Sequence, residues 1–197
     1  LPIYFNAYNF LAVYGAAFLL TEGEEEIDIP LSALGRVNGR FEAIAGTENK
    51  TAIVDYAHTP DALENVIKTI NNIRQNGVNL IIVVGCGGNR DTSKRPEMGQ
   101  IASKLSDRVI FTSDNPRNED PNAIIDAMDG GVEIQYKKKV LKITDRKEAI
   151  KTAILLSNPG DVILVAGKGH ETYQEVNGVK HPFDDKQIIS ELFNELG

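Results

Sequence analysis

The stretch "NLIIVVGCGG", residues 79–88, decides how the middle of this chain folds. Its apolar residues 80–84 follow one another without alternation and run directly into a glycine-rich segment. A continuous apolar run is typical of a strand that is buried on both faces of a parallel sheet, and the glycines predict a tight loop at its carboxyl end. The stretch "GDVILVAG", residues 160–167, has the same design. The sequence therefore predicts buried parallel strands at both places.

Helical patterns alternate with strand patterns around these stretches. Residues 39–57 read as two strands around a turn at Gly46–Lys50. Residues 59–77 have the pattern of a helix, with Thr59 as its cap and Pro60 at its first position. Further elements are expected as strands at 107–113 and 133–136, a hairpin on Asn177-Gly178, and helices at 93–105, 120–128, 145–157 and 184–196. This alternation predicts an α/β fold, a doubly wound and mostly parallel Rossmann-like sheet with helices on both faces.

The chain is expected to divide near residue 38. Residues 39–197 hold the alternating pattern, whereas residues 6–20 read as a helix followed by the acidic run "TEGEEE", residues 21–26. A short helix or turn is expected at 29–37. Because the chain begins without Met and inside an element, we expect a fragment of a longer protein, in which residues 1–38 are the tail of another domain plus a linker.

Composition disfavours several classes of protein. The formal net charge is −7 over 197 residues, which disfavours non-specific binding to nucleic acid or to an anionic membrane. The longest apolar-rich stretch, residues 9–20, is too short to span a bilayer, and no signal peptide pattern opens the chain. Cys86 is the single cysteine, which fits a reducing cytoplasm. We expect a cytoplasmic protein without nucleic acid or membrane partners.

Charged side chains follow four of the predicted strands, in loops at residues 55–61, 85–96, 113–121 and 166–174. Ligands bind at the carboxyl ends of the strands in open parallel sheets, so we expect these loops to converge on one rim. The residues that this arrangement gathers are Asp55, His58, Arg90, Asp114, Arg117, Lys168, His170 and Glu171.

Simpler readings explain part of this set. Residues 85–90, "GCGGNR", lack the ending of a Walker A loop and the glycine spacing of a dinucleotide loop, so a plain glycine turn explains them equally well. Asp120, and Glu119 more loosely, read as caps of the following helix. His58 alone reads as a capping or packing residue. The three histidines and one cysteine are dispersed, so we expect no metal site built by this chain.

These readings leave Arg90, Asp114, Asn115, Arg117 and Glu171 unexplained. Guanidinium groups bind carboxylates through paired hydrogen bonds, and acids with an amide suit an ammonium group. The rim therefore has the composition expected of a site for a zwitterionic small molecule, an amino acid.

Five motifs carry a resemblance to a known family. They are "GRFE" (39–42), "DYAHTPDALENVI" (55–67), "GCGGNRDTSKRPEMG" (85–99), "DNPRNEDP" (114–121) and "VAGKGHETYQ" (165–174), and in this order and spacing the chain resembles the Mur ligase family. The resemblance covers essentially the whole chain. It implies that residues 39–197 are the C-terminal, amino acid-binding domain, and that residues 1–38 are a helical remnant of the central ATPase domain plus a linker.

The resemblance also implies a chemistry. These ligases use ATP and Mg²⁺ to convert a substrate carboxylate into an acyl phosphate, which an incoming amine attacks. The motifs are most similar to those of members that add meso-diaminopimelate to UDP-MurNAc-L-Ala-D-Glu in cytoplasmic peptidoglycan precursor synthesis. The metal ions and most phosphate contacts belong to parts of the family that precede Leu1, so we expect this chain to be inactive alone. Relatives are commonly monomers, and we expect a monomer here.

The family's functional residues map onto positions of this sequence. Those implied for meso-diaminopimelate are Arg90, Asp114, Asn115, Pro116, Arg117, Gly167 and Glu171; those implied for ATP are Asn9, Arg40, Asp55 and His58. Arg117, assisted by Arg90, is expected to pair with the far carboxylate, which L-lysine lacks. Two alternatives remain open, namely an L-lysine-adding member of the family and a stand-alone amino acid-binding module.

Overall fold

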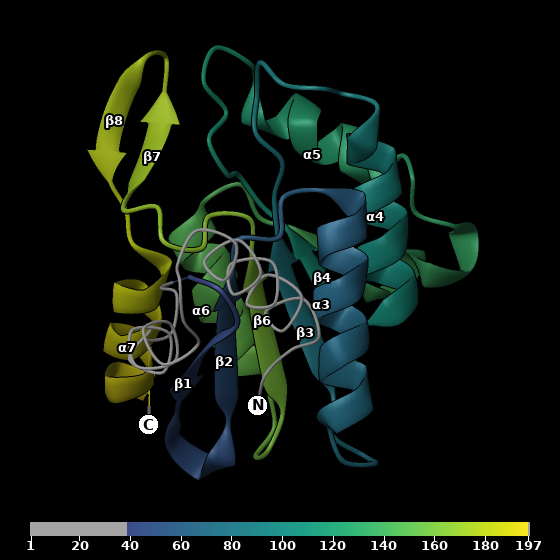
Figure 1. Ribbon diagram of the computed structural model, residues 1–197, viewed down its shortest axis with the longest axis vertical. Helices are drawn as coiled ribbons and strands as arrows, with labels where there is room; N and C mark the ends of the chain where they lie inside the picture. Colours follow the sequence, from purple (N-terminus) through teal and green to yellow (C-terminus); the bar gives the residue numbers. More distant parts are fainter. Residues whose placement is uncertain (1–38, 197) are drawn as a thin grey trace, which may run out of the picture. The chain divides into compact units, whose positions relative to one another are not determined.

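A computed structural model describes residues 39–196 of the chain (Figure 1). Several expectations lie outside the described residues, namely the helix over 6–20, the short helix or turn over 29–37, the remnant domain 1–38 and the nucleotide contact Asn9.

The described residues form one six-stranded sheet and a separate hairpin. The order across the sheet is β1-β2-β6-β3-β4-β5, and every neighbouring pair is parallel except β1 with β2. The strands are β1 (Glu42–Ala45), β2 (Thr51–Asp55), β3 (Leu80–Val84), β4 (Arg108–Phe111), β5 (Val140–Lys142) and β6 (Val162–Ala166). A short 3-10 helix, Thr47–Asn49, makes the turn between β1 and β2.

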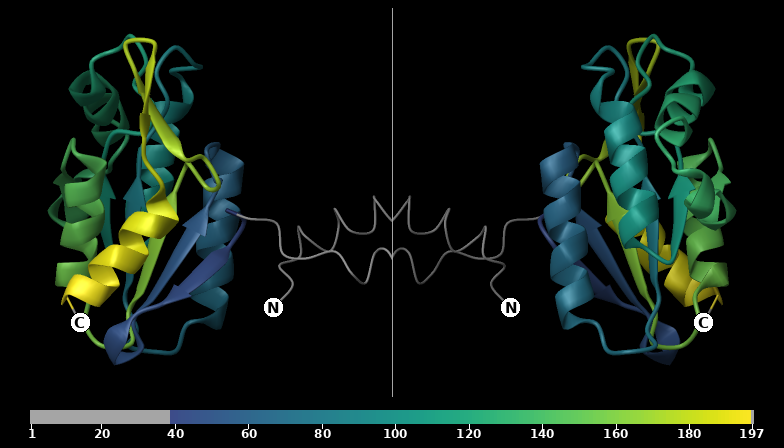
Figure 2. Two further views of the ribbon diagram at one scale, coloured as in Figure 1. Left: turned by 90° about the vertical axis from the view of Figure 1, so that its left-hand side faces the viewer. Right: turned by 90° about the vertical axis from the view of Figure 1, so that its right-hand side faces the viewer.

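Helices cover both faces of the sheet, as the side views show (Figure 2). The helices are α3 (Pro60–Ile73), α4 (Lys94–Leu105), α5 (Pro121–Asp129), α6 (Arg146–Leu156) and α7 (Asp185–Leu196). Leu80, Ile82 and Val84 of β3 pack in one apolar cluster with α3, α4 and α5. Ile81 and Val83 pack in a second cluster with α6 and α7. Continuous apolar strands are therefore buried on both sides, and the predicted doubly wound fold is confirmed.

Helix starts follow the predicted caps. The Thr59 hydroxyl accepts a hydrogen bond from the Ala62 amide at 3.4 Å, and Pro60 is the first residue of α3. The Asp120 carboxylate accepts one from the Asn122 amide at 2.9 Å, ahead of α5. Helix α4 begins at Lys94, one residue after the predicted start at residue 93. Pro96 is tolerated there because the first turn of a helix needs no backbone donor.

The prediction of a strand at residues 133–136 was wrong. The chain instead forms a 3-10 helix over Ile134–Lys139, and the edge strand β5 follows directly after it. This turn lets Tyr136 pack against the apolar core while Ile134 stays 92% exposed. Pairing with β4 is then made by Val140, which lies opposite Val109.

The predicted hairpin is confirmed as β7 (Tyr173–Val176) and β8 (Val179–Pro182), which project beyond the sheet (Figure 1). Its turn residues Asn177 and Gly178 have φ values of 49° and 77°, the positive values of a two-residue hairpin turn. Among residues 39–196, no helix combines the length and apolar character that crossing a bilayer requires.

Candidate functional site

The loops after β2, β3, β4 and β6 line one pocket of about 420 Å³ at the carboxyl edge of the sheet. This volume lies within the range of small-molecule sites, roughly 300–1,000 Å³. The residues that line it are Tyr56, His58, Thr59, Gly87, Arg90, Asp91, Lys94, Asp114, Asn115, Arg117, Gly167 and Glu171. The structure thus brings together the residues expected to hold an amino acid, with the exception of Pro116.

Pro116 has a place in the packing of two loops. Its carbonyl oxygen accepts a hydrogen bond from the Glu119 amide at 3.0 Å. The same oxygen lies 1.9 Å from where a Cβ on Gly88 would sit, so this close approach requires glycine. The loop after β3 therefore packs directly on the loop after β4.

The residues expected to bind ATP are more scattered. His58 lines the pocket, and its Nδ1 lies 2.8 Å from the Tyr56 carbonyl oxygen. The Arg40 guanidinium lies 5.4 Å from the centre of the Tyr56 ring, outside the pocket lining. Asp55 Oδ2 accepts a hydrogen bond from the Phe41 amide at 2.7 Å, and burial raises the pKa of Asp55. Asp55 thus fixes the chain just before β1.

Arg117 is held by two neighbouring segments. Its φ is 52°, a left-handed conformation that is uncommon outside glycine. Its amide donates to the Glu175 carbonyl oxygen at 3.0 Å, and its carbonyl accepts from the Asn177 amide at 2.7 Å. Its side chain donates from Nη1 to the Gly88 carbonyl at 2.8 Å, and Nε lies 3.3 Å from Glu175 Oε2. The hairpin and the glycine loop together set where this guanidinium points.

The loop that carries Arg90 is held in place by a neighbouring residue, whereas the Arg90 side chain is not. Among residues 39–196 its guanidinium makes no hydrogen bond or ion pair, and it is exposed. The clamp is Glu119, which accepts from the Asn89 amide and lies 2.9 Å from Nη1 of the buried Arg95. The hydrogen bond from Arg95 lowers the pKa of Glu119. Reading Glu119 as a loose helix cap was therefore wrong.

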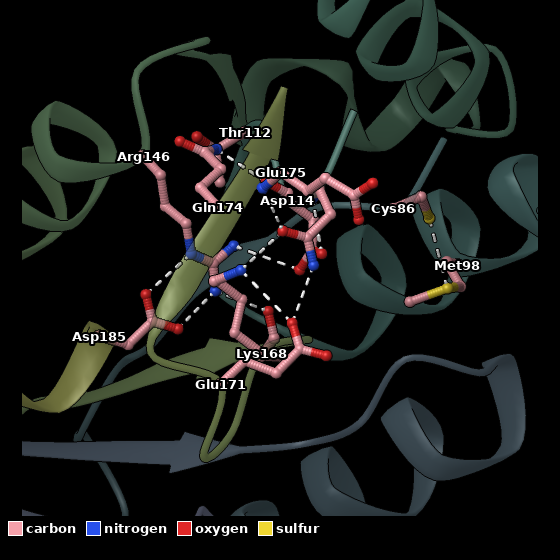
Figure 3. A network of polar contacts seen from close by, with 12 residues as sticks. Cys86, Met98, Thr112, Asp114, Arg146, Lys168, Glu171, Gln174, Glu175 and Asp185 are labelled. Atoms are coloured by element: carbon pink, nitrogen blue, oxygen red, sulfur yellow. Dashed lines mark hydrogen bonds and ion pairs between the residues drawn. The ribbon is translucent and has the colours of Figure 1, made fainter. Parts of the chain in front are cut away.

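Asn115, Lys168 and Glu171 form a connected polar wall. Figure 3 labels Lys168 and Glu171 of this wall. Asn115 Nδ2 donates to Glu171 Oε2 at 2.8 Å, and Lys168 Nζ donates to Asn115 Oδ1 at 3.1 Å. Lys168 Nζ also lies 3.5 Å from Glu171 Oε2, and its side chain has no exposed surface. Burial lowers the pKa of Lys168. Because each group is hydrogen-bonded, the wall is set before any ligand arrives.

Asp114 lies buried between this wall and the sheet. Its Oδ1 accepts from the Asn115 amide at 2.7 Å, and its backbone carbonyl accepts from Gln174 Nε2 at 2.7 Å. Its Oδ2 is buried and has no hydrogen-bond partner among the described residues. Gly167 has a φ of 116°, and a Cβ there would lie 2.7 Å from this Oδ2. Burial raises the pKa of Asp114, and the Arg146 and Lys168 cations oppose that rise.

Arg146 and Asp185 escaped the sequence analysis, although they lie at the back of the site (Figure 3). Arg146 Nε and Nη2 donate to the two carboxylate oxygens of Asp185 at 2.8 Å and 2.7 Å. One signal was available: Arg146 opens α6, and a cation there opposes the helix dipole. Lys94 was missed too, and it donates to the His58 carbonyl at 2.9 Å.

The pocket presents cations and acids side by side. Arg90, Lys94 and Arg117 can bind carboxylates, whereas Asp114 and Glu171 can accept hydrogen bonds from an ammonium group. In the stretch 39–196, no group of three or more His, Cys, Asp or Glu side chains is arranged to hold a metal ion. The arrangement suits a small zwitterion.

Known proteins resemble this chain along its whole length. The diaminopimelate ligase of Cytophaga hutchinsonii, UDP-N-acetylmuramoyl-L-alanyl-D-glutamate--2,6-diaminopimelate ligase, is 60% identical over 98% of this chain. The protein of the same name from Bacteroides thetaiotaomicron is 58% identical over 96% of it. The chain spans 40% and 39% of the lengths of these two relatives.

Solved structures and a family model agree with these relatives. A structure of a ligase of the same name matches 100% of this chain and 39% of its own, with a TM-score of 0.76 and 40% sequence identity. Residues 39–169 match the family model described as Mur ligase, glutamate ligase domain. With its doubly wound sheet and its pocket at the carboxyl edge, this chain belongs to the Mur ligase family.

Proposed function

We propose that this chain supplies the amino acid site of an ATP-dependent ligase that adds meso-diaminopimelate to UDP-MurNAc-L-Ala-D-Glu during peptidoglycan precursor synthesis in the cytoplasm. The observation that carries the proposal is one pocket in which Arg90 and Arg117 lie with Asp114, Asn115 and Glu171. The names of the relatives support the same substrate. Residues 39–197 are the amino acid-binding domain, and residues 1–38 are the tail of the central ATPase domain plus a linker.

The ligand is held through both of the charged groups at its far end. Arg117, with Arg90 beside it, pairs with the carboxylate at the far end of meso-diaminopimelate, and Asp114 and Glu171 accept hydrogen bonds from the far ammonium group. Asn115 and Gly167 shape the wall between them. Pro116 acts by packing the loop that carries Arg117 against Gly88.

Discrimination against L-lysine rests on Arg117. Its guanidinium is held by the Gly88 carbonyl and by Glu175, so it does not swing away when no carboxylate is present. Lysine would leave it without its ligand partner in a half-buried position. Sites that lose such a designed polar contact discriminate by roughly 10⁴-fold.

ATP supplies the driving force for amide formation when it is bound. Among the residues implied for it, Arg40 and Asp55 lie beside Tyr56 at the rim, and His58 lines the pocket itself. A cation and an aromatic face at the rim fit an anionic nucleotide, and Asn9 completes the proposed set. The Mg²⁺ ions and most phosphate contacts come from other domains of the ligase.

Replacing Arg117 with Ala in the ligase that contains this chain tests the proposal. The KM for meso-diaminopimelate should rise by roughly 10²-fold or more, since a charged hydrogen-bonded pair is lost, while the KM for ATP stays unchanged. Steady-state kinetics with each substrate varied in turn measures both. An equal KM for meso-diaminopimelate in the variant and the wild type would refute the assignment of Arg117 to this ligand.

The matched control is Arg74→Ala. Arg74 also pairs with a carboxylate, that of Asp107, but it lies at the amino ends of the strands. This variant should keep both KM values. A rise in the KM for meso-diaminopimelate in both variants would mean that loss of stability, and not loss of a ligand contact, explains the effect.

A further inference from the structure

Arg146 and Asp185 form a fully buried ion pair behind the pocket. Neither side chain has exposed surface, and two parallel hydrogen bonds of 2.8 Å and 2.7 Å join them (Figure 3). The pair joins α6 to the start of α7. Arg146 Nη2 also donates to the Ala166 carbonyl at 3.1 Å, one residue before Gly167. The guanidinium is therefore rigidly placed at the carboxyl end of β6.

The remaining nitrogen of this guanidinium faces the site. Arg146 Nη1 lies 4.0 Å from Asp114 Oδ2. Both atoms are buried, and neither has a hydrogen-bond partner among residues 39–196. A buried donor and a buried acceptor without hydrogen-bond partners cost folding free energy. If the Arg146–Asp185 pair only linked α6 to α7, the facing of Arg146 Nη1 and Asp114 Oδ2 would have no explanation.

We propose that Arg146 is a positioning residue for the amino acid site: anchored by Asp185, it favours the anionic form of the Asp114 carboxylate and holds that carboxylate turned toward Gly167 without touching the ligand. This inference rests on the proposed function only where it concerns diaminopimelate. The charge state of Asp114 matters because a neutral carboxyl group accepts an ammonium hydrogen bond poorly.

The electrostatics around Asp114 set the direction of the effect. The charged and titratable groups that act on it or respond to it are Arg146 from α6, Asp185 from α7, Lys168 and Glu171 from the loop after β6, Tyr56 after β2 and Cys86 after β3. Burial raises the Asp114 pKa most, Arg146 is the strongest opposing influence, and Asp185 adds only the weakest of these increases. Removing the Arg146–Asp185 pair should therefore raise the pKa of Asp114 further.

The variants must leave no buried charge alone. Arg146→Met by itself strands the Asp185 carboxylate, which is strongly destabilising, so the informative variant is Arg146→Met/Asp185→Leu. An apolar pair of similar size is often tolerated in such a position. Arg74→Met is the control, because it removes an arginine from an Arg–Asp pair at the other end of the sheet.

The experiment follows the Asp114 carboxyl carbon by NMR as the pH of the 197-residue chain is varied. In Arg146→Met/Asp185→Leu the titration midpoint should move up, by less than the roughly 1–3 units expected for an isolated opposite charge near 4 Å, because the Asp185 anion is removed as well. In Arg74→Met it should not move. A folded double variant with an unchanged midpoint would overturn the proposal and leave the pair a purely structural link between α6 and α7.

A second measurement needs no variant. In the wild-type chain the Arg146 guanidinium nitrogen signals should inflect at the same pH as the Asp114 carboxyl carbon, because the two groups face each other. Signals that stay flat through that pH would overturn the proposal even if the double variant failed to fold.

Ligand binding separates this inference from the proposed function. Where wild type binds meso-diaminopimelate, the double variant should bind it about tenfold more weakly for each unit by which the Asp114 midpoint rises above the working pH. If wild type binds no diaminopimelate while the Asp114 midpoint still shifts in the double variant, the proposed substrate fails and the positioning role stands. If binding is retained without any shift, the positioning role fails and the substrate stands.

Discussion

Gly167 lies next to Asp114 at the carboxyl end of β6, with a φ of 116° that an L side chain rarely adopts. In Gly167→Ala the new methyl group would meet Asp114 Oδ2 at 2.7 Å and displace the carboxylate. We expect a loss of about 1–3 kcal/mol of stability from backbone strain and a fall in affinity for the amino acid of roughly tenfold or more. Thermal unfolding and a ligand titration measure the two effects.

Gly160 gives the matched control for this prediction. Its φ is 85°, and no atom lies within 4 Å of the position that a Cβ would take. Gly160→Ala should therefore lose similar stability and keep its affinity for the ligand. An equal loss of affinity in both variants would show that Gly167 has no role beyond its backbone conformation.

Cys86 should be an unreactive thiol in the folded chain. It is buried against Met98, and burial raises the pKa of Cys86 to about 12. Since the thiolate is the reactive form, alkylation at pH 8 should be about a thousandfold slower than in the denatured chain. Mass spectrometry after timed exposure to an alkylating reagent measures the rate. Rapid labelling of the native chain would place Cys86 in an open and mobile loop.

The Cys86 thiol also gives stability a defined pH dependence. The unfolded chain releases the thiol proton near pH 9, whereas the folded chain holds it to about pH 12. The stability contributed by this group is complete below pH 9 and is lost as the pH rises toward 12. Comparing the alkaline unfolding of wild type with that of Cys86→Ala isolates this contribution.

Sequence reasoning found the residues whose chemistry is unusual for their place. Arg117 in a loop with two prolines was conspicuous, and the structure puts it in the pocket. Arg146 and Asp185 were not found, because their pairing depends on α6 and α7 packing side by side, which no local pattern encodes. Glu119 was misread for the same reason, since its partner Arg95 comes from helix α4, which is distant in sequence.

At the scale of single elements, the β7–β8 hairpin should act as a brace for Arg117. Its turn needs positive φ at Asn177 and Gly178, so replacing both with Ala should cost about 1 kcal/mol at each position. The Arg117 amide donates to the Glu175 carbonyl oxygen of the hairpin, and the Asn177 amide donates to the Arg117 carbonyl oxygen. Both amide protons should exchange with solvent faster when the hairpin is weakened. Hydrogen exchange read by NMR tests this.

Amides of the central strands β3 and β6 serve as the internal reference for the hairpin variant. Their exchange should not change, because the hairpin forms its own two-stranded sheet. A uniform acceleration across the domain would contradict the brace and would mean that the hairpin contributes to global stability instead.

Elements were predictable where local chemistry fixes their ends. Thr59, Asp120 and Asp145 each cap a helix through their own side chains, and each had been placed at or next to a predicted start. Residues 133–136 were misassigned because their alternating pattern suits a strand equally well. Their conformation is decided by Tyr136, which packs on a core formed by distant helices.

At the scale of the whole molecule, the 197-residue chain should bind its amino acid without catalysing amide formation. The proposed ATP and metal contacts lie mostly in other domains, so we expect no ATP-dependent amide formation by this chain alone. A coupled assay for ADP release in the presence of meso-diaminopimelate and UDP-MurNAc-dipeptide checks this. Detectable turnover would refute the division of labour proposed here.

NMR titrations of the same chain separate recognition from turnover. meso-Diaminopimelate should shift the signals of residues around Arg90, Arg117 and Glu171, whereas L-lysine should not. Equal shifts with both would mean that the far carboxylate is not read. The absence of shifts with either would mean that the site is completed only when the other domains close over it.

The strand order of the sheet has a consequence for how the protein is made. Strand β6 lies between β2 and β3, and Thr51 of β2 pairs with Val162 of β6. During synthesis, β2 and β3 leave the ribosome early but have no neighbour in common until β6 emerges. A nascent chain stopped before Val162 holds two open sheet edges, a template for aggregation. Completion of the pocket and completion of the sheet therefore happen together, when β6 emerges, and chaperone protection of the growing chain is most valuable until then.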